Sequence, residues 1–171
     1  MTSGKHCEIE RKYLIRYPDT RLLSEQPGCE IWDIVQTYLT DGEGGQTRRV
    51  RQVTTGGRVT YHRTFKRRLS ALSAEEDEGR IDLATYAAYV LQRDTSRTPI
   101  VKTRYRVPYH GHVLEFDIYP FWCDRAIMEI ELQSEDETPD IPEWVGIIRD
   151  VTSEKAYKNR QLAKRVPMEE I

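Results

Sequence analysis

The chain has 171 residues, and 26 lysines and arginines against 28 aspartates and glutamates give it a formal net charge of −2. With 38% hydrophobic and 32% charged residues it can bury a core, which excludes a disordered chain, and the near-neutral charge disfavours a protein that coats nucleic acid. No stretch approaches the roughly 20 apolar residues of a membrane-spanning helix, and residues 1–11 lack the apolar core of a secretory signal. We therefore predict one cytoplasmic domain over residues 1–171, with no membrane partner.

Alternation of polar and apolar residues with a period of two predicts the strands. Eight are expected, at about 6–14, 33–39, 47–54, 59–67, 75–82, 100–108, 112–119 and 126–133. The connections contain residues that tolerate positive φ, such as Gly56-Gly57 and His110-Gly111, and these are typical of hairpins. The strands should therefore be antiparallel neighbours.

Helical periodicity is clearest at 83–93, where one stripe is apolar: Leu83, Tyr86, Ala87, Val90 and Leu91. A second helix is expected at 154–165, after the capping residue Ser153, and weaker helical turns at 140–149 and 21–25. The helix at 83–93 should cover an apolar face of the sheet.

Charged residues share one face on most of the predicted strands. They are Glu8, Glu10, Lys12, Arg49, Arg51, Lys66, Glu76, Glu78, Lys102, Arg104, Arg106, Glu115, Asp117, Glu129 and Glu131. An open sheet with one solvated face crossed by ion pairs would explain this pattern, and so would a closed barrel with the charges inside. Buried charges that only pair with one another contribute little to stability, so in a barrel they favour a ligand. Carboxylates suit Mg²⁺ or Mn²⁺ and clustered Arg and Lys suit phosphate, which together predict a metal–polyphosphate site.

The segment Glu8-Ile-Glu10-Arg-Lys12 resembles the Glu-x-Glu-x-Lys signature of the triphosphate tunnel metalloenzymes, or CYTH family. Further segments resemble family elements in the same order: Arg49-Val-Arg51, Thr64-Phe-Lys66, Glu76-Asp-Glu78, Lys102-Thr-Arg104-Tyr-Arg106, Glu115-Phe-Asp117, Glu129-Ile-Glu131 and a closing segment at about 150–165. The resemblance implies an α+β fold. Its centre would be a closed eight-stranded antiparallel β-barrel, or tunnel, with a charged lumen and a few helices packed outside.

The resemblance also implies roles for individual residues. The phosphates would be bound by Lys12, Arg49, Arg51, Lys66, Lys102, Arg104 and Arg106. The metal would be held among Glu8, Glu10, Glu115, Asp117, Glu129 and Glu131, with Glu76 and Glu78 completing the tunnel wall. Lys102, Glu10 and Glu129 are the expected catalytic residues. Many relatives carry an Arg shortly before the Glu76 pair; this chain does not, and Arg67 and Arg68 are candidates to compensate.

Two interpretations remain open for Tyr157 and Lys158: a latch that closes over bound ligand, or a solvated helix. The compact chain looks most like bacterial members that cleave inorganic tripolyphosphate to pyrophosphate and phosphate, so metal-dependent hydrolysis of a terminal phosphoanhydride is the expected reaction. The alternatives are a class IV adenylyl cyclase-like activity, a thiamine or nucleoside triphosphatase, and a non-catalytic polyphosphate- or nucleotide-binding module. A nucleic-acid partner is disfavoured because the tryptophans Trp32, Trp122 and Trp144 are scattered.

Overall fold

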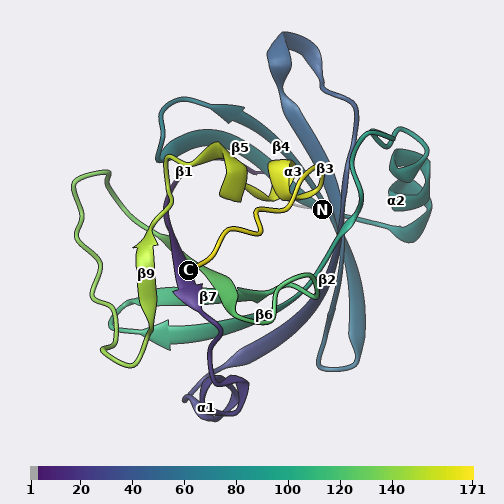
Figure 1. Ribbon diagram of the computed structural model, residues 1–171. Helices are drawn as coiled ribbons and strands as arrows, with labels where there is room; N and C mark the ends of the chain where they lie inside the picture. The colour runs from purple at the N-terminus through teal and green to yellow at the C-terminus, as the bar shows by residue number, and fades with distance from the viewer. Residues whose placement is uncertain (1–3) are drawn as a thin grey trace.

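A closed antiparallel barrel dominates the computed structural model, which describes residues 4–171 (Figure 1). Within that range nine strands are hydrogen-bonded in the order β5-β4-β3-β2-β6-β7-β8-β1-β9, and a further pairing of β1 with β5 closes the ring. Their bounds are β1 Gly4–Arg16, β2 Glu30–Tyr38, β3 Thr47–Thr55, β4 Arg58–Arg68, β5 Ser73–Ile81, β6 Ile100–Tyr109, β7 His112–Ile118, β8 Arg125–Glu131 and β9 Ile147–Asp150. The predicted eight-stranded barrel is confirmed, with β9 added at the edge of β1.

Two tight hairpins have the backbone that the sequence predicts. Gly56 and Gly57 join β3 to β4 with φ of 55° and 73°, and His110 and Gly111 join β6 to β7 with φ of 46° and 80°. Positive φ at both central residues defines the type I′ turn, whose twist matches that of the flanking strands. Each turn thereby places consecutive strands side by side in the barrel wall.

The helices are short and lie outside the wall or at one end of it. They are α1 Thr20–Glu25, α2 Leu83–Val90 and α3 Asn159–Leu162, with the 3₁₀ turns η1 Glu43–Gly45 and η2 Lys155–Tyr157. In the described part of the chain no helix is both long and apolar enough to cross a lipid bilayer. The helices thus cover parts of the barrel and leave its interior to the strands.

Helix α2 covers the outer face of β3 and β4, as predicted, but with a different stripe. Tyr86, Tyr89 and Val90 pack against the buried cluster of that face, whereas Leu83 and Leu91 are 59% and 83% exposed. Asp82 caps the start of the helix, where its carboxylate accepts a hydrogen bond from the Thr85 amide, and the helix ends earlier than expected. The predicted stripe was therefore right at Tyr86 and Val90 and wrong at Leu83, Ala87 and Leu91, which are exposed.

Two other helix predictions are wrong. The segment predicted as a helix at 154–165 is split at Lys158, whose φ of −77° and ψ of 137° are extended. Neither short piece has a side-chain cap, so tertiary packing of Tyr157 and Leu162 holds the segment in place. Part of the segment predicted as helical turns at 140–149 is strand β9, because β5 pairs with β1 only as far as Ile9 and leaves the edge beyond it for β9.

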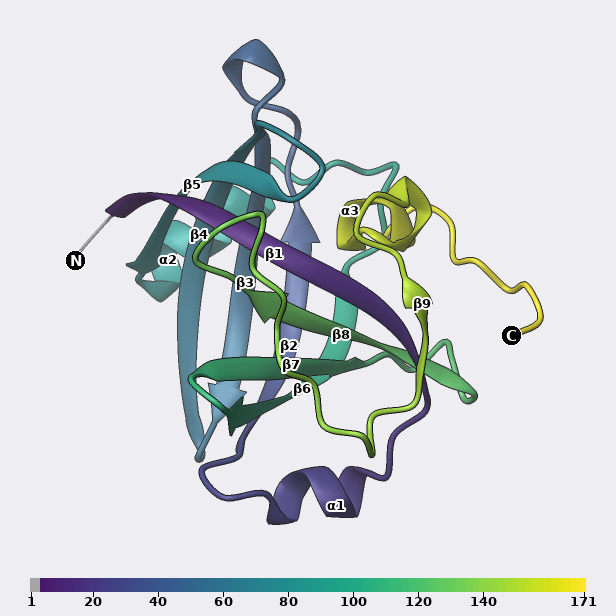
Figure 2. The ribbon, with the colours of Figure 1, turned by 90° about the vertical axis from the view of Figure 1, so that its left-hand side faces the viewer.

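An apolar plug closes part of one end of the barrel. The strands contribute Leu14, Tyr38, Ile100 and Ile127 to it, and segments outside the strands add Tyr119, Trp122, Val151, Tyr157, Leu162 and Ala163. Figures 1 and 2 show η2 and α3 lying against this end. A second apolar cluster lies on the outer face of β7 and β8, with Phe116 and Met128 at its centre. Apolar residues are thus outside the wall and in the plug, and the middle of the lumen is left to the charges.

Candidate active site

A cavity of about 350 Å³ lies inside the barrel. Most of the predicted site residues line it: Glu8, Glu10, Lys12, Arg49, Arg51, Lys66, Glu76, Glu78, Arg104, Arg106, Glu115, Glu129 and Glu131. Side chains at alternate positions of a strand point to one face, so closing the sheet brings all of these faces together. The charged faces therefore line a lumen, and the open-sheet alternative is excluded.

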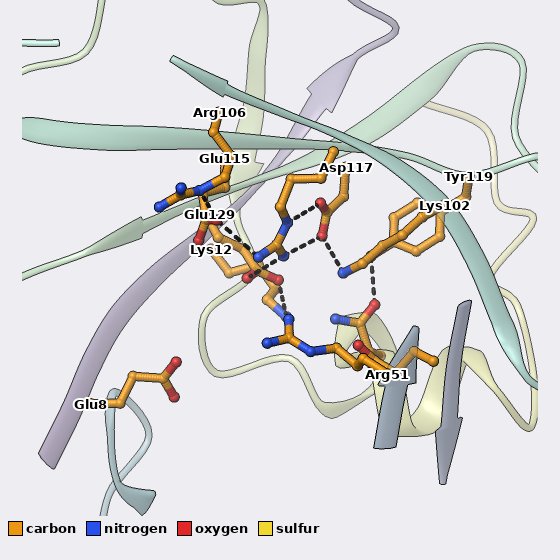
Figure 3. A network of polar contacts seen from close by, with 12 residues as sticks. Glu8, Lys12, Arg51, Lys102, Arg106, Glu115, Asp117, Tyr119 and Glu129 are labelled. Atoms are coloured by element: carbon orange, nitrogen blue, oxygen red, sulfur yellow. Dashed lines mark hydrogen bonds and ion pairs between the residues drawn. The ribbon is translucent and has the colours of Figure 1, made fainter. Parts of the chain in front are cut away.

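Lys102 and Asp117, two predicted site residues, do not line this cavity. They are 2% and 0% exposed and form a buried ion pair, with 2.6 Å between Lys102 Nζ and Asp117 Oδ2 (Figure 3). Arg104 also donates to both carboxylate oxygens of Asp117, at 2.6 and 2.8 Å. Asp117 is thus committed to two cations, and the roles predicted for it as a metal ligand and for Lys102 as a catalytic contact are not supported by this geometry.

Burial lowers the pKa of Lys102 to about 8, and the neighbouring charge of Arg104 acts in the same direction. The Asp117 carboxylate opposes this shift. Lys102 Nζ also lies 5.8 Å from the centre of the Tyr119 ring, inside the apolar plug. Lys102 is therefore a positioning residue, which acts on the cavity through its ion pair with Asp117 and through its charge near Arg104 and Glu129.

Ion pairs in the lumen join neighbouring strands, such as β1 with β8, and also strands that are not neighbours, such as β6 with β8. Lys12 Nζ lies 3.0 Å from Glu129, and Arg104 reaches both Glu129 and Glu115, at 3.3 and 3.0 Å (Figure 3). Farther round the wall, Arg51 pairs with Glu78 at 2.5 Å. Lys66 pairs with both Glu8 and Glu76. These pairs fix the orientation of the long side chains.

Two carboxylates in the lumen have too little compensating charge. Glu10 and Glu131 are register partners on β1 and β8, and both line the cavity. Burial, together with Glu129 and Glu8, raises the pKa of Glu10; burial and Glu8 raise that of Glu131. A cation bound here would relieve this repulsion.

The carboxylate oxygens of this cluster fit a hard divalent cation by their chemistry. Within residues 4–171 no three or more Asp, Glu, His or Cys side chains already converge on one point at metal-binding distance. The carboxylates that would have to converge are held by ion pairs with Lys12 and Lys66. Phosphate groups that drew these lysines and Arg104 away would free Glu129 and Glu8.

Three cations near one end of the cavity have no such partner. In the described chain, no carboxylate lies within ion-pairing distance of Arg49, Arg68 or Lys158, and all three line the cavity. Burial lowers the pKa of Lys158 to about 8, and the positive charges of Arg68 and Lys12 add to the shift. This end of the lumen is therefore poised to bind an anion.

The pKa of Lys158 predicts how anion binding varies with pH. Its ammonium loses a proton as the pH rises through about 8, so the affinity of the cavity for tripolyphosphate should fall between pH 7 and pH 9. Titration calorimetry in the presence of a chelator would measure this without turnover. In Lys158→Met the affinity should be lower at pH 7 and should fall less steeply than in the wild type over this range; a dependence as steep as that of the wild type would contradict the assignment.

Of the two residues predicted as a latch, only Lys158 faces the cavity. Tyr157 is 2% exposed in the apolar plug, and its hydroxyl is hydrogen-bonded to Arg149, at 3.3 Å, and to Glu169. The solvated helix offered as the alternative is wrong, because the chain is extended at Lys158, and closure of Lys158 over a bound ligand stays a prediction. Tyr157 anchors the segment that presents Lys158.

The sequence prediction missed several residues of the cavity lining, among them Trp32, His6 and Arg160. Trp32 and His6 lie on the lumen faces of β2 and β1, so the period-two pattern could have identified them. Arg68 lies on the same lumen face of β4 as Lys66. The sequence suggested Arg67 and Arg68 only as substitutes for the arginine that many relatives carry before the Glu76 pair. Arg68 lines the cavity, and Arg67 does not. No sequence signal identified Arg160, because it follows an irregular break in the chain.

No protein-family model matches the chain. It is 32% identical over 166 residues to an inorganic triphosphatase from Nitrosomonas europaea, covering 94% of this chain and 99% of that protein. The crystal structure of the inorganic triphosphatase NE1496 aligns with a TM-score of 0.56 and 28% identity, again over 94% and 99% of the two chains. The PH1819 protein of Pyrococcus horikoshii, at 18% identity and a TM-score of 0.57 over 75% and 80%, shares the fold.

The protein is a closed antiparallel β-barrel whose lumen is lined by both basic and acidic side chains, which places it in the class of charged β-tunnels. Because the similarity to the Nitrosomonas protein extends along nearly the whole of both chains, this chain belongs to the triphosphate tunnel metalloenzyme family. The predicted membership is confirmed.

Proposed function

We propose that this protein hydrolyses inorganic tripolyphosphate to pyrophosphate and phosphate, with Mg²⁺ or Mn²⁺ as cofactor. The observation that carries the proposal is the lumen itself, where six cations assigned to phosphate face a cluster of carboxylates in one cavity. The whole-length similarity to an inorganic triphosphatase supports this substrate over a nucleotide or a thiamine ester.

The phosphates would be bound by Lys12, Arg49, Arg51, Lys66, Arg104 and Arg106. Five of these cations are paired with carboxylates, and Arg49 has no ion-pair partner among residues 4–171. Exchanging a carboxylate for a phosphate oxygen conserves the charge-assisted hydrogen bonds, and the arginines can bind phosphate with two parallel bonds. The substrate would therefore enter a preorganised set of donors.

The metal would be held by Glu8, Glu10, Glu129 and Glu131, with Glu115 beside them. When bound, it supplies positive charge against the phosphate oxygens and acidifies a water. Glu10, which lies in the cavity beside Glu8 and Glu129, would accept the proton of the attacking water. The water oxygen bonds to the terminal phosphorus, the anhydride P–O bond breaks, and pyrophosphate leaves with its electron pair.

Release of phosphate from tripolyphosphate, ATP and thiamine triphosphate, each with Mg²⁺, Mn²⁺ or chelator, tests the proposal. We expect release from tripolyphosphate that requires metal and that exceeds release from the other two. Binding of tripolyphosphate without release, with either metal, would favour the non-catalytic module. Loss of ATP without release of orthophosphate would favour a cyclase.

A further inference from the structure

A tryptophan lines the cavity toward the end that lies away from the apolar plug. Trp32 is on β2, six residues before Tyr38, which is part of the plug. At the rise of a strand these six residues span roughly 20 Å along the barrel wall. On β6, the neighbour of β2, Arg106 is likewise six residues from the plug residue Ile100. Trp32 and Arg106 therefore lie together, far from the plug and the closing segment.

The guanidinium of Arg106 covers the face of the Trp32 ring. Its central carbon lies 4.4 Å from the ring centre, which is a cation–π contact. Arg106 Nε donates to Glu115 at 3.1 Å and Nη1 donates to Glu30 at 3.3 Å; Figure 3 shows Arg106 beside Glu115. The same oxygen of Glu30 accepts a hydrogen bond from the Trp32 indole nitrogen, at 3.0 Å. Because Glu30 binds both groups, it holds the guanidinium and the ring against each other.

These contacts contribute little to the stability of the fold. The side chain of Glu30 is 57% exposed and that of Arg106 is 28% exposed, and ion pairs of such groups are weak in water. Arg106 and Trp32 both line the cavity, however, so their arrangement determines what a ligand finds there. The effect of this cluster is therefore expected on binding.

An organic triphosphate needs a stacking surface that tripolyphosphate does not need. It has three phosphates like the inorganic anion, and in addition an aromatic group, and such groups bind proteins by stacking on aromatic side chains. Among residues 4–171 the other aromatic side chains of the cavity lining are His6 and Tyr38. Tyr38 is 5% exposed in the plug, and the imidazole of His6 is a smaller ring than an indole. Trp32 is thus the main stacking surface of the lumen, and Arg106 occupies it.

We propose that Arg106, held across Trp32 by Glu30 and Glu115, makes the tunnel selective for inorganic triphosphate, because it covers the ring on which a nucleobase or a thiamine ring would stack. The inference rests on the proposed function and identifies the residues that select its substrate. An organic group would have to displace the guanidinium from the ring and from its carboxylates before it could stack. A phosphate can accept hydrogen bonds at the edge of the guanidinium while the face of that group stays on the ring.

Calorimetric titration with ATP and with tripolyphosphate, in chelator so that turnover is stopped, tests this selectivity. The wild-type protein should bind tripolyphosphate more tightly than ATP. Arg106→Lys keeps the positive charge but lacks the planar fork that binds two carboxylates, so it should uncover the ring. We expect the affinity for ATP relative to that for tripolyphosphate to rise about tenfold in this variant, the gain of one stacked base.

Three further variants show whether the uncovered ring is the cause. Adding Trp32→Leu to Arg106→Lys should remove the gain for ATP. Glu30→Gln, at an exposed position, should raise the relative affinity for ATP by about threefold, because it weakens the hold on Arg106 and leaves every phosphate-binding residue in place. Arg63→Lys is the matched control: Arg63 lies 5.0 Å from the centre of the Phe65 ring, does not line the cavity, and should leave the ratio unchanged.

Equal affinity of the wild-type protein for ATP and tripolyphosphate would overturn the inference. So would an Arg106→Lys variant without a gain for ATP. A gain that persisted after Trp32→Leu would overturn it as well, since it would show a wider lumen and not an uncovered ring. Failure of the wild-type protein to bind tripolyphosphate would instead contradict the proposed function.

Discussion

Replacing Glu10 by Gln should lower kcat for phosphate release from tripolyphosphate by at least about 100-fold, without loss of stability. Glu10 lies in the lumen among other carboxylates, and its pKa is raised. Because the folded pKa lies above the unfolded one, the ionised side chain destabilises the fold at neutral pH. Gln resembles the protonated form, so the midpoint of urea unfolding should stay the same or rise while turnover is lost.

Glu75→Gln is the matched control, since Glu75 is exposed on β5 beside the lumen residue Glu76 and does not line the cavity. It should leave both turnover and the unfolding midpoint unchanged. A Glu10→Gln variant that unfolded at a clearly lower urea concentration than the wild type would show that Glu10 has a structural role. One that retained turnover with metal present would remove it from the catalytic residues.

The second large effect is expected at Asp117, and on stability. Asp117→Asn should lower the free energy of unfolding by about 3–5 kcal/mol, because it leaves Lys102 and Arg104 buried without this counter-charge. Urea unfolding followed by circular dichroism measures the loss. Adding Lys102→Met in the same chain should recover part of it, since one uncompensated charge is then removed.

Glu115→Gln serves as the comparison for Asp117→Asn, because Glu115 also pairs with Arg104 but is 21% exposed in its side chain. It should cost less stability, since water and Glu129 can still compensate Arg104. If Asp117→Asn kept wild-type stability and lost only turnover, Asp117 would be a ligand of substrate or metal after all. Stability and turnover measured together distinguish an ion pair that holds the fold from one that binds substrate or metal.

The lumen thus contains two kinds of charge. Buried pairs such as Arg104 with Asp117 hold the tunnel wall and have pKa values shifted toward their charged forms, whereas groups such as Glu10 and Lys158 lack compensation and have pKa values shifted toward their neutral forms. Uncompensated groups of both signs in one cavity fit a ligand that carries both signs, such as a polyphosphate with its cation. This contrast could not be read from charge alone.

The sequence by itself determined which residues face the lumen. The period of two is a local property of each strand, so Glu8 with Glu10 and Arg49 with Arg51 were correctly placed on the lumen face without knowledge of the fold. It also indicated the hairpins, since Gly56-Gly57 needs only local backbone freedom. The resemblance to the family then identified the barrel.

Only the tertiary structure decided how far along the tunnel each residue lies. Strands in a closed barrel are tilted and staggered, so residues that share a face can be at different depths, and Lys102 and Asp117 fall in the plugged end while Arg104 reaches the cavity. Contacts with residues more than a hundred positions away place Arg160 at the cavity and form strand β9. Arg160 binds Asp41, and β9 pairs with β1 at Tyr13. Local periodicity cannot encode such contacts, because their energy depends on which distant surface the closed barrel leaves unpaired.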